Sequence, residues 1–191
     1  MSFFTSLLQK TATLRNISIL FILSQLVFLS MMLLTFPKIN AQIGTHAFDL
    51  RTFGYSQVIA ERIVAKLTTE TRQLYLFPQL ALLDVVYPIL LALFLSSLLY
   101  RLVPKNQGHR SILLILPFMS LCFDYIENIC IALLITKSIP TSTSFVFFSS
   151  SCTILKSVCT TLSWIIILVI FAIRLIEFIR NKHTRRLKNP S

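Results

Sequence analysis

The run ISILFILSQLVFLSMMLLTF, residues 17–36, decides the fold because it carries no charged side chain over its whole length. A bilayer core about 30 Å thick is crossed by about 20 apolar residues in a helix. The run therefore predicts a membrane-spanning helix that Pro37 closes. A cleaved signal peptide is the alternative, because Lys10 and Arg15 precede the run. The length of the run and the lack of a following Ala-x-Ala site favour the span.

Three further apolar runs predict spans over about 79–102, 112–136 and 157–179. The composition agrees, with 55% hydrophobic and 13% charged residues, where soluble domains have about a quarter charged. The mean hydropathy is +0.77. Once four spans are subtracted from 191 residues, no segment remains that could bury a separate soluble core. We expect residues 1–191 to form one all-α domain, a polytopic membrane four-helix bundle.

The distribution of positive charge predicts the orientation and the partners. Eleven Lys and Arg residues fall on the side of the two termini and seven on the other side. This bias predicts that both termini are cytoplasmic, and it favours a plasma membrane or a bacterial inner membrane. The basic tail, residues 180–191, is expected to contact anionic headgroups of membrane lipids. Because the basic residues lie between and after apolar runs, the net charge of +11 does not predict a nucleic-acid partner.

The first loop predicts structure of its own. Ser56 is a good N-cap, and apolar residues follow at helical spacing, so residues 56–76 are expected to form an amphipathic surface helix that bends into the second span. Such a helix could be a packing plug or a moving lid, and the pattern favours the plug.

Three carboxyl groups lie inside predicted spans: Asp84 in the second, and Asp124 and Glu127 in the third. A charge there costs about 2.5–3.5 kcal/mol on insertion scales, so each needs an explanation. Asp124, Glu127 and Asn128 share one face of a helix. The topology places Asp84 about 8 Å and Glu127 about 14 Å below the outer surface at 1.5 Å per residue.

These residues predict a polar cavity that opens outward under the loop helix. Lys156 is expected to begin the fourth span on that side. Other polar side chains that would face the cavity are Gln25, Thr160, Thr161 and Ser163. Clustered carboxyl groups in a low dielectric cannot all ionise cheaply, so at least one is expected to exchange a proton near neutrality. The cysteines and histidines lack the spacing of metal ligands, and neither a metal nor a cofactor is predicted.

Three segments carry a resemblance: FGYS at 53–56, TRQLYLFPQLALLDVVYP at 71–88 and FDYIEN at 123–128. Over about residues 45–136, the chain resembles a group of small four-span membrane proteins without an assigned activity. They share an aromatic-Gly-Tyr-Ser/Thr start of a surface helix, an Asp-x-x-Tyr-Pro in span two and an Asp-x-x-Glu-Asn in span three. The resemblance implies that the polar residues of these two spans belong together: Asp84, Tyr87, Pro88, Asp124, Glu127 and Asn128.

Three functions follow from this pattern. In the first, the protein binds a lipid or another hydrophobic molecule, with or without converting it chemically. Asp124 or Glu127 would then be the acid or base, Asp84 its charge partner, and Tyr87 and Asn128 orienting groups. Lys156 and Gln25 are further candidate binding residues. The second is a proton-linked transporter or channel subunit. The third is a scaffold whose carboxyl groups only fix helix register. Each of the three functions is compatible with a homo-oligomer or with a membrane-protein partner.

Overall fold

A computed structural model describes residues 3–104 and 110–188, with side chains over 5–104 and 110–180. This part of the chain is all-α and contains no strand. Four stretches of helix are long and apolar enough to cross a membrane: Leu14–Ile43, Thr69–Leu102, Arg110–Ile135 and Thr143–Arg180. Their length and composition indicate an integral membrane protein. The predicted all-α bundle of four spans is confirmed.

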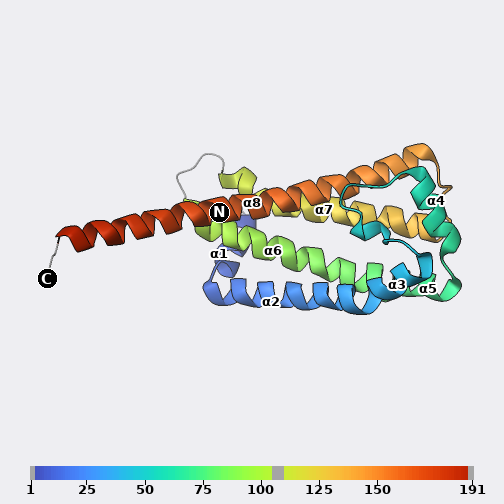
Figure 1. Cartoon of the computed structure of the whole chain (residues 1–191), viewed down its shortest axis with the longest axis horizontal. Coiled ribbons are helices and arrows are strands. Elements are labelled where there is room, and N and C mark those ends of the chain that lie inside the picture. The colour runs from blue at the N-terminus through green and yellow to red at the C-terminus, as the bar shows by residue number, and fades with distance from the viewer. Residues whose placement is uncertain (1–2, 105–109, 189–191) are drawn as a thin grey trace.

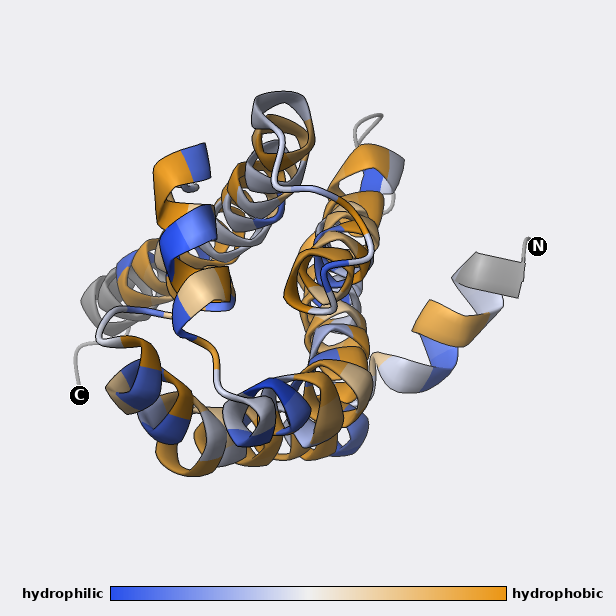
Figure 2. Cartoon of the chain, turned by 90° about the vertical axis from the view of Figure 1, so that its right-hand side faces the viewer, coloured by the Kyte–Doolittle hydropathy of each residue, from blue (hydrophilic) through white to orange (hydrophobic). Residues whose placement is uncertain are grey.

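The four spans pack in a simple order. Helix α6 (Asp84–Leu102) lies against α2 (Leu14–Ser30) on one side and α7 (Arg110–Ile135) on the other, and α7 also packs on α8 (Thr143–Lys188). Figure 1 shows the short helices of the first loop at one end of the bundle, which we term the loop end. The C-terminal end of α6 and the N-terminal end of α7 lie at the opposite end, the terminal end, beyond which α8 projects. The first helix, α1 (Phe3–Thr11), stands beside the ring of spans (Figure 2).

The first span is longer than predicted. After α2, a π-helical turn, η1 (Met31–Thr35), leads into α3 (Phe36–Ile43). Pro37 lies in the first turn of α3, where a backbone N–H needs no partner within the helix. The helix ends instead at Gly44, which adopts the left-handed conformation with φ of 66°. The prediction that Pro37 closes the span is therefore wrong.

The predicted loop helix over 56–76 is two helices. Ser56 caps α4 (Gln57–Lys66), as expected, by accepting a hydrogen bond from the backbone of Ile59. Leu67 is then extended, and Thr68 caps α5 (Thr69–Leu74). Helix α5 continues through a π-helical stretch, η3 (Tyr75–Leu83), into α6, with non-helical backbone at Phe77 before the proline. The second span thus begins ten residues earlier than the predicted start at 79.

The fourth span also begins earlier than predicted. Helix α8 starts at Thr143, so Lys156 lies about 20 Å along the helix at 1.5 Å per residue and does not begin it. The serine-rich stretch SFVFFSSSCTIL, residues 144–155, resembles a loop in sequence but is helical. Two of its serines, Ser149 and Ser150, turn inward and are buried against the first loop.

The first loop is held against α8 by its FGYS segment. The Tyr55 backbone N–H donates to Ser150 Oγ over 2.8 Å, and the Tyr55 hydroxyl lies 2.6 Å from Ser149 Oγ. Burial raises the pKa of the Tyr55 hydroxyl, which therefore stays protonated at neutral pH. Gly54 has φ of 82°, and a Cβ on this residue would overlap Ser150 Oγ. Glycine is required here both for the backbone conformation and for the close approach of α8.

Gly54→Ala should therefore destabilise the protein more than Gly44→Ala does. Both glycines have positive φ, which costs an alanine about 1–2 kcal/mol. At Gly44 the added methyl group would meet only the flexible end of Lys66, whereas at Gly54 it would meet α8. We expect an additional loss of at least about 1 kcal/mol for Gly54→Ala. Thermal unfolding of both variants in detergent measures the difference, and equal melting temperatures would disprove the steric argument.

The buried apolar residues form two clusters, one near each end. The loop-end cluster is built around Phe48, Ile63 and Ile135, and the terminal-end cluster around Leu8, Leu95 and Ile167. Between them lie the buried carboxyl groups of α6 and α7. Outside the bundle, apolar side chains such as Leu33 and Leu168 are more than half exposed, as expected for surfaces that face lipid.

Candidate functional site

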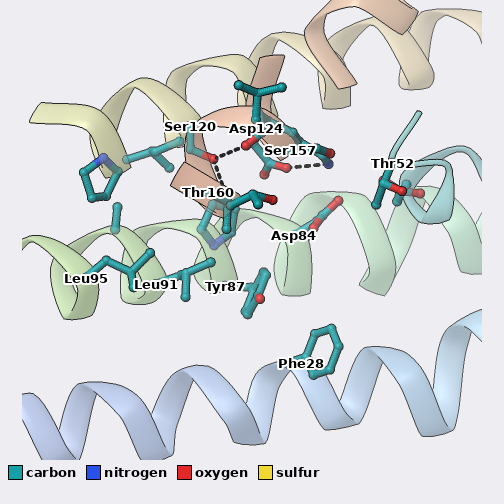
Figure 3. Close-up of a pocket in the computed structure, with 18 of the residues that line it drawn as sticks. Phe28, Thr52, Asp84, Tyr87, Leu91, Leu95, Ser120, Asp124, Ser157 and Thr160 are labelled. Atoms are coloured by element: carbon teal, nitrogen blue, oxygen red, sulfur yellow. Dashed lines mark hydrogen bonds and ion pairs between the residues drawn. The ribbon is translucent and has the colours of Figure 1, made fainter. Parts of the chain in front are cut away.

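A cavity of about 660 Å³ lies between the two apolar clusters. Its volume falls in the range of about 300–1,000 Å³ typical of small-molecule sites. Residues of α2, α6, α7, α8 and the first loop line it. Figure 3 shows residues of α2, α6 and α7 around this one space. The apolar part of the wall includes Phe28, Met31, Leu91, Ala92, Leu95, Pro117 and Leu162.

The polar part of the wall has its acidic residues toward the loop end and most of its hydroxyl groups along α7 and α8, beside the apolar residues. It includes Asp49, Thr52, Asp84, Tyr87, Ser120, Asp124, Lys156, Ser157 and Thr160. The four predicted site residues Asp84, Tyr87, Asp124 and Lys156 therefore share one cavity. Glu127, Asn128 and Gln25 are not on its wall.

Lys156 is the centre of a buried ion triad. Its ammonium lies 2.7 Å from Asp124 Oδ1 and also pairs with Glu127 Oε2. Glu127 is completely buried, and its other oxygen accepts a 2.6 Å hydrogen bond from the Thr153 hydroxyl. Glu127 thus lies behind the cavity wall, with its partners on α8. A buried charge in lipid normally finds such a partner, and the triad joins α7 to α8.

Asn128 joins α7 to α6. Its amide donates to the backbone carbonyl of Asp84 over 3.2 Å and lies 3.5 Å from Asp124 Oδ2. Asn128 is 8% exposed and Asp124 is 7% exposed, so this face of α7 points into the bundle. The contact also places the backbone of Asp84 level with Asn128. Asn128 therefore fixes the position of α6 relative to the acidic face of α7.

Asp84 faces a second carboxyl group that the sequence did not indicate. Asp49, from the 3₁₀ turn η2 (Phe48–Leu50), lines the same cavity and interacts with the Asp84 carboxyl group electrostatically. The Tyr75 hydroxyl donates to Asp49 Oδ2 over 2.5 Å and accepts from the Phe48 backbone N–H over 2.9 Å. Tyr75 is completely buried. The first loop therefore contributes a fixed acid to the cavity.

The remaining predicted residues divide into two groups. Tyr87 lines the cavity and stacks on Phe28 of α2 with ring centroids 5.7 Å apart. Gln25 instead bonds to Ser24 on its own helix, and the structure does not place it with the acidic residues. Ser163 donates to a backbone carbonyl of α8 and is also away from the cavity. The expected placement of Gln25 and Ser163 in the cavity is wrong.

Two hydroxyl groups on α7 and α8 complete the polar wall. Ser120 Oγ donates to the carbonyl of Lys156 over 3.0 Å and lies 2.6 Å from Thr160 Oγ1 (Figure 3). Ser120 lies one helical turn before Asp124, so its position on the same face could have been read from the sequence. Asp49 had no comparable signal, because only the folded loop brings it to Asp84.

In the part of the chain that the structure describes, no group of three or more His, Cys, Asp or Glu residues is arranged so that it could hold a metal ion.

A second pocket, of about 400 Å³, lies at the terminal end and contains Arg101, Arg110 and Arg174. Each arginine donates to a backbone carbonyl: that of Ala12, Tyr100 and Leu102, respectively. The guanidinium of Arg110 also stacks over the Tyr100 ring at 4.4 Å. Positive charge therefore gathers at the end of the bundle opposite the acidic cavity.

Comparison with known proteins gives no match, whether to family models, to curated proteins or to solved structures.

Proposed function

We propose that this membrane protein binds a lipid or another hydrophobic small molecule in the 660 Å³ cavity, with the polar end of the molecule at Asp84 and Asp124. The observation that carries the proposal is that one cavity wall combines acidic and hydroxyl groups with many apolar side chains. Such a wall matches an amphiphile, because the polar end finds hydrogen-bond partners while the chain stays among apolar side chains.

Access from the bilayer supports the same function. Phe28 and Met31 on the α2 side, and Ile154, Val158 and Leu162 on α8, line the cavity, and in the described part of the chain α2 and α8 are not packed against each other. The neighbouring outward positions Leu29 and Leu155 are 47% and 43% exposed. A molecule dissolved in lipid would meet mainly apolar side chains beside these two helices.

The geometry also redistributes the proposed chemical roles. Asp84 and Asp124 are on the wall and can reach a bound molecule, whereas Glu127 is enclosed behind it. If the molecule is converted, Asp84 and Asp124 are the residues suited to acid or base work. We assign Glu127 to holding Lys156, and Asn128 to holding α6. Turnover of an identified ligand that persists in both Asp84→Asn and Asp124→Asn would exclude these catalytic roles.

Native mass spectrometry of the purified protein tests the binding proposal. We expect the wild-type protein to release a co-purified amphiphile, and Leu91→Trp, which fills the apolar part of the cavity, to reduce its occupancy at least about tenfold. Leu168→Trp is the matched control, because Leu168 is 60% exposed to lipid and should leave the occupancy unchanged. Equal occupancy in all three proteins would show that the cavity is not the binding site and would favour the scaffold.

We further infer that both termini are cytoplasmic. The three arginines of the terminal-end pocket support this orientation, because Arg and Lys beside spans favour the cytoplasmic side. The basic tail would then contact anionic lipid on that side, although its side chains after Arg180 lie outside the described residues. A C-terminal reporter that is active only outside the cytoplasm should be silent, and an active reporter would reverse the orientation.

A further inference from the structure

The charges on the cavity wall are unbalanced. Asp49, Asp84 and Asp124 line the cavity with one cation, Lys156. The Lys156 ammonium also forms an ion pair with Glu127 behind the wall, so its charge is already shared between the carboxylates of Asp124 and Glu127. The ion triad is therefore net negative when its members are ionised, and the pair of Asp49 and Asp84 adds further acid beside it. A positively charged guest would reduce this imbalance, whereas a phosphate or carboxylate would increase it.

The unsatisfied atoms on the wall are acceptors. Among the described residues that line the cavity, the buried side-chain atoms without a hydrogen-bond partner are Asp49 Oδ1 and Asp84 Oδ2. Asp84 is only 3% exposed, so its orphaned oxygen has little access to solvent except through the cavity. Buried acceptors of this kind are normally satisfied. The missing donors come from water, from a guest molecule or from a proton held between the two acids.

An ammonium group fits these requirements better than other polar heads. It carries three donors and no acceptor, so it can bond to both orphaned oxygens at once. An alcohol has a single donor, and an ionised fatty acid has none. The ammonium of Lys156 already shows how this wall binds such a group, because Asp124 holds it at 2.7 Å.

Aromatic side chains lie beside the acids. Tyr87 lines the cavity one helical turn beyond Asp84, and its ring stacks on Phe28 at 5.7 Å. The face of an aromatic ring attracts a cation within about 6 Å. From Asp84 to Leu95 the α6 wall is about 16 Å long at 1.5 Å per residue, which is room for a single alkyl chain beyond the head.

We propose that the cavity selects a single-chain amphiphile with a primary ammonium head, held by Asp84 and Asp49 and with its alkyl chain along Leu91 and Leu95. This inference rests on the proposed function, since it names the ligand class of the same cavity. The competing arrangement is a proton shared by Asp49 and Asp84, which would satisfy both oxygens and leave the head of the guest neutral.

Competition in phosphatidylcholine nanodiscs distinguishes the two arrangements. Hexadecylamine, hexadecanol and hexadecanoate are offered at equal mole fraction, and bound molecules are counted by native mass spectrometry. We expect the amine to bind at least about tenfold more tightly than the alcohol, because charged hydrogen bonds replace neutral ones. The carboxylate should bind most weakly.

Two variants and one control make the result specific. Asp84→Asn should reduce the preference for the amine to about threefold or less while alcohol binding persists, and Asp49→Asn should act in the same direction from the loop side. Leu91→Trp should reduce binding of both the amine and the alcohol. An amine preference of less than threefold in the wild type, with binding that Leu91→Trp still abolishes, would overturn the ammonium proposal and keep the cavity as a lipid site. Binding of neither compound, or binding unaffected by Leu91→Trp, would instead refute the proposed function.

Discussion

Lys156→Met is expected to lower the free energy of unfolding by about 3–5 kcal/mol. The substitution keeps an unbranched side chain but removes the ammonium that Asp124 and Glu127 share. Glu127 is completely buried and the Lys156 side chain is only 15% exposed, so water cannot replace the lost partner. Two carboxyl groups would remain next to each other in a low dielectric. Thermal unfolding in detergent measures this loss of stability. The unfolding is monitored by the reaction of buried Cys130 and Cys152 with a thiol-reactive dye.

Two controls separate charge from packing at this position. Lys38→Met removes an exposed lysine at the loop end and should leave the melting temperature unchanged. Adding Asp124→Asn and Glu127→Gln to Lys156→Met should restore most of the stability, because no uncompensated charge remains. A Lys156→Met protein that melts like the wild type would mean that the triad does not hold α7 to α8.

Tyr75→Phe should lower the free energy of unfolding by about 3 kcal/mol, although it removes a single oxygen atom. The Tyr75 hydroxyl donates to Asp49 and accepts from the Phe48 backbone N–H, and the ring is completely buried. Its removal leaves a buried N–H and a carboxyl oxygen without partners, each of which costs about 1–3 kcal/mol. The same loss frees Asp49, so the loop end should open as well.

Tyr125→Phe is the matched control for Tyr75→Phe. Its hydroxyl donates only to the carbonyl of Val85, in an exposed position where water can replace it. We expect a loss below about 1 kcal/mol for Tyr125→Phe. Hydrogen exchange of residues 48–56 should rise in Tyr75→Phe alone. Equal stability of the two variants would show that Asp49 is not fixed by Tyr75.

The four spans could be predicted from the sequence because their signal is local. An uncharged apolar run as long as residues 17–36 is typical of a membrane-spanning helix. The acidic face of α7 was predictable for the same reason, since helical spacing alone places Asp124, Glu127 and Asn128 on one side. The structure turns that face inward, where these residues are at most 8% exposed.

The ends of the elements and the partners of the acids were not predictable in this way. Three consecutive serines, residues 149–151, and the charge of Lys156 interrupt the apolar run before residue 157. The contacts of Ser149 and Ser150 with the first loop leave no local signal in the sequence. The position of Asp49 could not be predicted from helical periodicity either, because a 3₁₀ turn and Tyr75 of η3 bring it to Asp84. Gln25 resembled a site residue only because it is polar and lies mid-span. Its side-chain amide donates to the hydroxyl of its neighbour Ser24.

Trp164 provides the most direct measurement of whether an amphiphile occupies the cavity. It is the one tryptophan in the chain, and it lies 5.8 Å from Phe94 on the terminal side of the cavity. Along α6, Phe94 is about 15 Å from Asp84 at 1.5 Å per residue. With the head of the amphiphile at Asp84, a bromine at the end of its chain would lie near Trp164, and a bromine next to the head would not. We expect saturable quenching of Trp164 fluorescence by the chain-end bromide alone, reversed by the unbrominated compound. Quenching that rises linearly with mole fraction and is the same for both bromides would contradict a bound amphiphile in this cavity.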